Sequence, residues 1–338
     1  MDKPASSANQ QLGLFLNSLS TQITQARNRE DLRAILREVS AFGRPLRYDN
    51  KHYWIGLSTA LVISAMALLS IKFYPNIDFV PWLAGGAAIL GVVFAILIFM
   101  RRNKISGLSD ALYKRDVYLD NNWQSVNYHG KKLAAQLGQD FSEFKRGNHL
   151  REISWLVKGH FQGLEHQFDY HAYTFHYVDR RQVVTTDSKG KIRTRTVYDH
   201  HYRYGLYLPF EFVHDMAIYS SWFGGLFSGS YKPASVAFNR QFKVKADNEL
   251  VAAKFLKPAV VVEIEDMGKG LSELNLEFSA NGRLCISYAQ NICSWKRQYG
   301  LDNPEHFLQE IEGDQTLSQL NNTLKRIHTL MRHSDNNF

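Results

Sequence analysis

The chain has 338 residues, a formal net charge of +8 at pH 7 and two cysteines. Hydrophobic residues make up 45% and aromatic residues 13% of the chain, which excludes an intrinsically disordered protein. Two cysteines cannot build a disulfide scaffold, and they fit a reducing compartment. The basic balance favours association with anionic surfaces, but it is spread along the chain and identifies no nucleic acid.

Residues 1–50 are predicted to form a cytoplasmic helical segment. An apolar stripe recurs at helical spacing, and a second helical stretch covers 32–39 and ends near Gly43 and Pro45. The stripe consists of Leu12, Leu16, Leu19, Ile23 and Ala26. These helices either serve a partner or self-association, or pack against the C-terminal domain of the same chain; the second reading is favoured.

Residues 51–104 are predicted to form a transmembrane hairpin. The stretches 54–71 and 79–100 contain no Lys, Arg, Asp or Glu. At about 1.5 Å per residue, each covers roughly 30 Å as a helix, the thickness of the hydrocarbon core of a bilayer. Pro75 and Asn76 suit the turn, and small residues that include Gly85, Gly86 and Gly91 would let the helices approach closely. A buried hairpin in a soluble core and a cleaved signal peptide fit this pattern less well.

The residues that flank the hairpin predict its orientation. Basic residues precede the first stretch and follow the second, namely Arg44, Arg47, Lys51, Arg101, Arg102 and Lys104. The connector carries only Lys72 and Asp78. Because basic residues are retained on the cytoplasmic side, both termini are expected there. The lack of charge within either stretch favours an anchor over a transport path.

The remainder predicts an α+β fold, in which the hairpin is followed by a cytoplasmic domain with a largely antiparallel sheet and flanking helices. Residues 105–150 read as a helical connector with a break near Asn121, and 151–300 as the α+β domain. Successive strands are expected over 153–161, 165–178 and 194–210, with the tip of a long hairpin at 187–190.

The second half of the domain mixes helices and strands. A strand is expected over 236–244, then a helical stretch over 250–267 that Pro258 divides. Two strands follow, within 271–279 and 283–295. Residues 301–338 are predicted as a C-terminal helical segment with a weak point at Gly313.

Two sequence stretches carry a resemblance to a known family. KGHFQGLEHQFDYHAY covers 158–173, and NRQFKVKADNELVAAKFLKPAVVVEIEDM covers 239–267. Placed after a two-helix hairpin, they resemble a family of bacterial membrane proteins known only as domain of unknown function 3137, over roughly 54–295. The resemblance implies a multi-pass protein of the cell inner membrane with a cytoplasmic α+β domain. It supplies no catalytic residues, and the basic insertion over 180–195 departs from it.

No chemical signature of catalysis is present. Seven histidines gather in the strand region, but alternation places His166 and His176 on one face and His171 on the other, and His200 and His201 also oppose each other. The remaining two are His160 and His214. There is no HExxH, CxxC, phosphate-binding loop or GxSxG motif. We therefore predict no catalytic, metal or cofactor site. Cys285 and Cys293 are expected as buried thiols that could face each other across a hairpin near Ala289.

The candidate contact residues are basic and aromatic. The predicted hairpin tip carries the six cations Arg180, Arg181, Lys189, Lys191, Arg193 and Arg195, and a glycine-rich segment carries Trp222, Phe223 and Phe227. These residues either contact anionic lipid or a partner, or form a solvated tip and a cover over the domain's own core. Nucleic acid is disfavoured, because no binding motif accompanies them.

The sequence favours a membrane-anchored, non-enzymatic protein that presents a cytoplasmic interaction or scaffold domain. Its partners would be the bilayer, through 54–71 and 79–100, and a protein or another copy of the chain, through the terminal helices. The alternatives are a membrane-anchored enzyme or small-ligand-binding domain, and an anionic-lipid-binding module.

Overall fold

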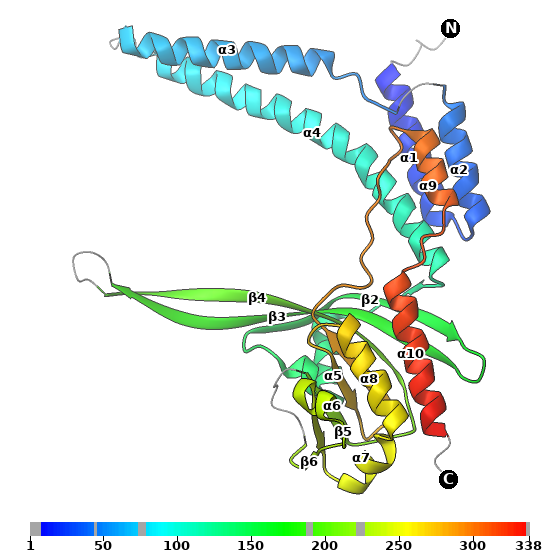
Figure 1. Ribbon diagram of the computed structural model, residues 1–338. Coiled ribbons are helices and arrows are strands. Elements are labelled where there is room, and N and C mark those ends of the chain that lie inside the picture. The colour runs from blue at the N-terminus through cyan, green and yellow to red at the C-terminus, as the bar shows by residue number, and fades with distance from the viewer. Residues whose placement is uncertain (1–7, 44–45, 74–78, 187–191, 221–226, 336–338) are drawn as a thin grey trace. The chain divides into compact units, whose positions relative to one another are not determined.

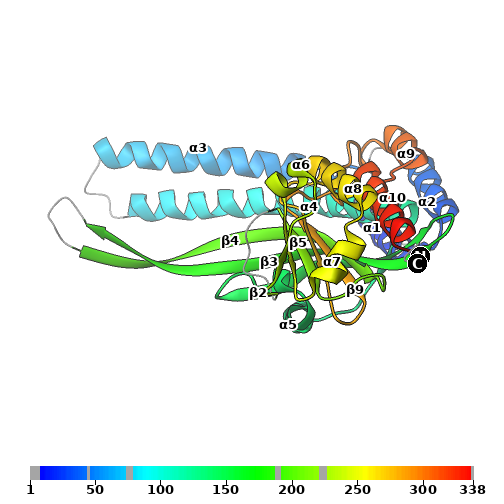
Figure 2. The same cartoon turned by 60° about the horizontal axis from the view of Figure 1, so that its bottom comes forward.

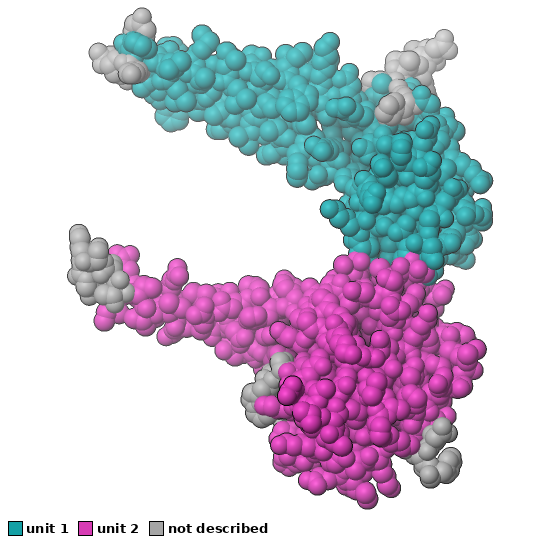
Figure 3. Space-filling model, in the orientation of Figure 1, with its two compact units in different colours: residues 1–120, 295–315 teal, residues 121–294, 316–338 magenta. Residues whose placement is uncertain are grey.

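The computed structural model describes residues 8–43, 46–73, 79–186, 192–220 and 227–335 (Figure 1). The chain forms two compact units, coloured separately in Figure 3. Unit 1 comprises 1–120 and 295–315, and unit 2 comprises 121–294 and 316–338. Helices combine with an antiparallel sheet, and two apolar helices precede it, so the predicted fold class is confirmed.

Unit 1 contains a small helical bundle. Helices α1 (Ala8–Gln25) and α2 (Arg29–Ala41) pack with each other and with α4 (Phe79–Asp120), and α9 (Pro304–Glu312) packs with α2 and contacts α4. The predicted stripe on α1 is buried, so the chain itself covers it. Helix α2 begins where the Asn28 side chain accepts a bond from the backbone N–H of Asp31, whose own carboxylate accepts from the backbone of Asn28.

Helices α3 (Lys51–Phe73) and α4 are long and apolar enough to cross a membrane. Only 17% of the most apolar window of each helix is buried. A helix in the core of a soluble protein would be mostly buried, whereas large apolar side chains such as Leu69 and Ile89 are exposed here. The predicted connector, 74–78, lies outside the described residues.

Small residues allow α3 and α4 to pack closely, but only some of the predicted ones lie at the contact. A Cβ on Gly56 would lie 2.7 Å from the Phe94 ring, and one on Gly91 would touch Ala60 at 3.7 Å. The expectation is wrong for Gly85 and Gly86, where a Cβ would meet nothing within 4 Å.

Unit 2 is built on a nine-stranded sheet in the order β1-β2-β3-β4-β9-β8-β5-β7-β6. Every strand pair is antiparallel. The strands are β1 (Gln124–Ser125), β2 (Leu150–Gln162), β3 (Gln167–Thr186), β4 (Ile192–Pro209), β5 (Met216–Tyr219), β6 (Ser230–Tyr231), β7 (Lys243–Ala246), β8 (Asn275–Phe278) and β9 (Arg283–Tyr288).

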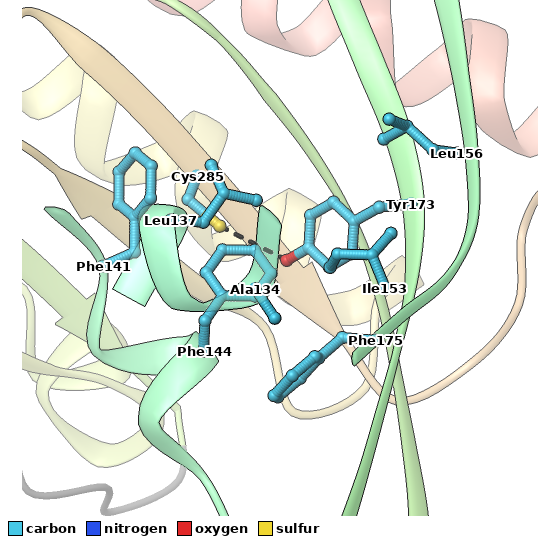
Figure 4. Close-up of a cluster of buried hydrophobic side chains, with 9 residues drawn as sticks. All are labelled: Ala134, Leu137, Phe141, Phe144, Ile153, Leu156, Tyr173, Phe175 and Cys285. Carbon is cyan, nitrogen blue, oxygen red and sulfur yellow. Dashed lines mark hydrogen bonds between the residues drawn. The ribbon is translucent and has the colours of Figure 1, made fainter. Parts of the chain in front are cut away.

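Helices lie on both sides of this sheet (Figures 1 and 2). Helix α5 (Gly130–Asp140) and the 3-10 helix η1 (Ser142–Lys145) pack against one side of β2 and β3. Figure 4 shows the core between them, where Phe144 meets Tyr173 and Phe175. On the other side α8 (Pro258–Gly270) packs with α10 (Ser318–Asp335) and α6 (Val236–Gln241), near α7 (Glu249–Phe255).

Two local predictions are wrong. Residues 236–241 form α6 instead of a strand, because Ser235 caps the helix and Phe238 and Phe242 are buried at helical spacing. No strand returns from Ala289, because β9 ends at Tyr288 and pairs with β4 and β8. The predicted divisions at Pro258 and Gly313 are confirmed, since α7 gives way to α8 and α9 to α10 there.

Candidate functional site

The β3–β4 hairpin extends beyond the sheet as a two-stranded arm, which we define as residues 179–186 and 192–199. The neighbouring strand β2 pairs with β3 only as far as Val178, and β9 pairs with β4 only from Tyr204 onward. Eight residue pairs therefore have no third strand beside them, over about 25 Å. Figure 3 shows the arm as a projection from the body of unit 2.

Alternation along the strands divides the predicted basic residues between the two faces of the arm. Arg181, Arg193 and Arg195 share one face, because they pair with or lie two residues from Val183, Thr185 and Val197. Arg180 lies on the opposite face, with exposed Val184, Ile192 and Tyr198. Lys189, Lys191, Trp222 and Phe223 lie outside the described residues. Phe227 is half-buried and is not part of the arm.

Carboxylates neutralise the base of the arm. Arg181 Nε donates to Asp199 Oδ2 at 2.5 Å, and this bond lowers the pKa of Asp199. His201 Nε2 lies 3.6 Å from Asp179 Oδ2. Over its described residues the arm thus carries four arginines and two aspartates. Arg193 and Arg195 lie nearer the tip and share one face.

Histidines on β3 and β4 stack with rings on the neighbouring strand, as His176 does with His200. His176 Nδ1 lies 3.0 Å from Glu152 Oε1, and His176 Nε2 lies 2.9 Å from His200 Nδ1. His171 stacks on Tyr207, on the opposite face from His176, as alternation predicts. His166 precedes β3 and is not on the strand. Among the described residues no group of three or more His, Cys, Asp or Glu could hold a metal ion.

A buried ionic cluster stabilises the junction of η1 with the sheet. Arg203 on β4 donates to Glu143 Oε1 at 2.8 Å, and both side chains are buried. Glu277 on β8 accepts bonds from the backbone N–H groups of Ser142 and Glu143. Burial and the neighbouring Glu143 charge raise the pKa of Glu277 to about 7. Because these groups bond to one another, the cluster holds the fold together and presents no reactive group to solvent.

The two cysteines are structural. Both are buried and unpaired with each other, and burial raises the pKa of each thiol. Tyr173 Oη lies 3.3 Å from Cys285 Sγ in the core shown in Figure 4. The expectation of buried thiols is confirmed.

A second basic feature of unit 2 was not predicted from the sequence. The α5 groove, which has a volume of about 740 Å³, lies between α5, η1 and the start of β2. Its lining includes three cations, Lys131, Lys145 and Arg151, and also His149. The signals in the sequence were the basic pairs at 131–132 and 145–146, but nothing in their spacing shows that they meet.

Comparison with family models, curated proteins and solved structures found no match. The resemblance to domain of unknown function 3137 therefore stays a prediction.

Proposed function

We propose that this chain is a membrane-anchored interaction protein whose arm contacts the anionic lipid headgroups of the membrane that holds α3 and α4. Both termini and unit 2 would face the cytoplasm. The observation that carries the proposal is the arm itself, which extends beyond the sheet and combines an arginine-bearing face with exposed β-branched residues.

The anchor is supported by the polar end of the hairpin. The Arg101 guanidinium lies 4.4 Å from the centre of the Tyr53 ring and 3.0 Å from Asn50 Oδ1. An arginine beside a tyrosine is typical of the boundary between hydrocarbon and water. Arg102 and Lys104 follow directly, so several positive charges collect at this end.

The composition of the arm suits a lipid surface. Val184 is 62% and Ile192 is 68% exposed near the tip, and Tyr198 is also exposed. These groups lie on the face opposite Arg181, Arg193 and Arg195, and a division into an apolar and a basic face is typical of segments that lie in the headgroup region. Each basic residue near an anionic surface contributes about 1 kcal/mol of attraction. The covalent link to α4 also raises the effective concentration of the arm at the membrane.

The experiment places a fluorescent probe on the arm through Val184→Cys in the full-length protein. Cys285 and Cys293 are 1% and 6% exposed, so the probe reacts at position 184. The labelled protein is reconstituted into nanodiscs that contain a quencher attached to the lipid. We expect quenching in discs of phosphatidylcholine with phosphatidylglycerol, and far less in discs of phosphatidylcholine alone.

Two matched sets of variants differ in the charge of the arm and leave its strand pairing unchanged. Replacing Arg181, Arg193 and Arg195 by glutamate should abolish quenching, whereas replacing the same three by lysine should preserve most of it. Equal quenching in both kinds of disc, or none in either, would refute lipid contact. In that case co-purification with a protein that is lost on the glutamate substitutions would indicate a protein partner for the arm.

A further inference from the structure

The α5 groove has an apolar floor and a cationic rim. Small residues of α5 leave room along its side, and Phe144 and Leu150 close the bottom. The complete lining is Lys131, Ala134, Ala135, Gly138, Gln139, Phe144, Lys145, Asn148, His149, Leu150 and Arg151. Ala134 and Phe144 also belong to the core in Figure 4, so the floor is rigid.

A glycine fixes the loop that forms one wall. Gly147 adopts φ +76°, and a Cβ there would lie 2.9 Å from the Tyr177 ring. Asn148 accepts from the backbone N–H of Arg180 at 2.7 Å, which ties the loop to β3. These two constraints hold Lys145 and His149 at the groove.

The charges around the groove are not neutralised within the protein. No carboxylate lines the groove, and within the described ranges neither Lys131, Lys145 nor Arg151 makes an ion pair. Arg151 is held by backbone carbonyls instead, since its Nε donates to Arg146 O at 2.9 Å. Several arginines elsewhere in the chain do have carboxylate partners, as with Arg297 and Asp110 at 2.5 Å or Arg326 and Glu263 at 2.8 Å.

We propose that the α5 groove binds a phosphate-bearing ligand. Two lysines and an arginine around one concavity match the several oxygens of a phosphate, and charge-assisted bonds to them are among the strongest in proteins. The neutral amides of Gln139 and Asn148 can donate to the remaining oxygens. The apolar floor accommodates an uncharged part of the ligand. The phosphate belongs either to a lipid or to a soluble compound, and both supply the same anionic chemistry.

The test uses full-length protein in phosphatidylcholine nanodiscs and isothermal titration calorimetry, with empty discs as the blank. The probes are sodium pyrophosphate, dihexanoyl phosphatidic acid and dihexanoyl phosphatidylcholine. We expect saturable binding of at least one of the first two probes, with one site per chain, and none of the phosphatidylcholine. Tighter binding of the phosphatidic acid identifies a lipid source, and tighter binding of pyrophosphate a soluble source.

Two sets of variants locate the site. Replacing Lys131, Lys145 and Arg151 by alanine should weaken binding roughly tenfold or more, since each tenfold step corresponds to about one charge-assisted bond. The control replaces Lys132, Arg240 and Lys254 by alanine. These three residues are exposed and lie outside the groove, so the control removes the same charge. Ala135→Trp fills the groove without changing its charge and should also abolish binding.

Several results would overturn the proposal. These are equal binding of phosphatidylcholine, no binding of either anionic probe, an equal loss in the control, or unchanged affinity in Ala135→Trp. Circular dichroism and thermal melting verify that each variant is folded. The glutamate variant of the arm should retain groove binding, because its substitutions lie outside the groove lining.

Discussion

Asp116 on α4 is the least satisfied charged residue described in unit 1. Its side chain is fully buried, and neither carboxyl oxygen has a hydrogen-bond partner. Burial raises the pKa of Asp116 to about 7, the nearby Asp120 charge adds to this increase, and Arg29 opposes it. The carboxyl group is therefore protonated at mildly acidic pH and becomes a buried charge as the pH rises.

The burial of Asp116 makes the stability of the fold depend on pH. The pKa of Asp116 is higher in the folded than in the unfolded chain, so its folded form binds more protons between about pH 4 and 7. The free energy of unfolding should therefore fall as the pH rises from about 4 to 7, and Asp116 contributes up to about 1.4 kcal/mol per pH unit to this fall. Asp116→Asn should flatten the dependence of the melting temperature on pH, and raise the melting temperature at pH 8. A dependence identical to that of the unsubstituted protein would contradict this account of Asp116.

Arg203 supports a second buried charge, in unit 2. Burial alone would raise the pKa of Glu143, but Arg203 and Arg146 hold it below its usual value. Arg203→Met leaves Glu143 with Arg146 as its remaining arginine partner and should cost up to about 3–5 kcal/mol of unfolding free energy. Combining it with Glu143→Gln should recover part of that loss. Denaturant unfolding followed by near-ultraviolet circular dichroism measures both, and an additive double variant would argue against direct coupling.

At the scale of elements, the sequence predicted those whose signal is local. Two uninterrupted apolar stretches were enough for α3 and α4, and Pro258 and Gly313 marked real helix ends. Residues 236–242 were misread as a strand because seven residues with two phenylalanines, Phe238 and Phe242, fit either period. The face on which each arginine of the arm lies followed only from the strand register.

The α5 groove is a feature that could not be predicted from the sequence. Its three cations come from α5, η1 and β2, so they converge only after these elements pack. Several of the ion pairs that neutralise other arginines are also long-range, as with Arg297 and Asp110 or Arg326 and Glu263. From the sequence, Arg151 and Arg297 are indistinguishable, yet only Arg297 has a carboxylate partner.

The contact between α3 and α4 offers a matched pair of glycines for a test at this scale. Gly56 faces the Phe94 ring, whereas Gly85 has open space around it. Gly56→Leu should separate the helices and lower the melting temperature in detergent, and Gly85→Leu should leave it nearly unchanged, because only the first creates a clash. Equal effects of the two substitutions would show that the helices meet along another face.

At the scale of the whole molecule, unit 1 brings distant parts of the chain to one end of the hairpin. Lys104 Nζ donates to Asn17 Oδ1 at 2.9 Å, and Arg297 pairs with Asp110. Helix α9 packs on α2 and α4, as the contact of Phe307 with Tyr113 shows. The segments before α3, after the apolar part of α4, and around 295–315 therefore belong to one bundle. Because a bundle cannot form across a bilayer, we predict that these segments lie on one side of the membrane that α3 and α4 would cross.

The membrane topology of the chain can be tested directly. We predict that both termini lie on the same side as this bundle, and the basic residues at that end, Arg101, Arg102 and Lys104, favour the cytoplasm. Fusions of green fluorescent protein to either terminus should fluoresce in bacterial cells, and an alkaline phosphatase inserted in the connector at Asn76 should be active outside the cytoplasm. The phosphatase is also fused to each terminus. Activity at only one terminus would contradict the bundle, because α1 and α9 could not then both contact α4. Active phosphatase at both termini would keep the bundle and reverse its side, which would withdraw unit 2 and its arm from the cytoplasmic leaflet.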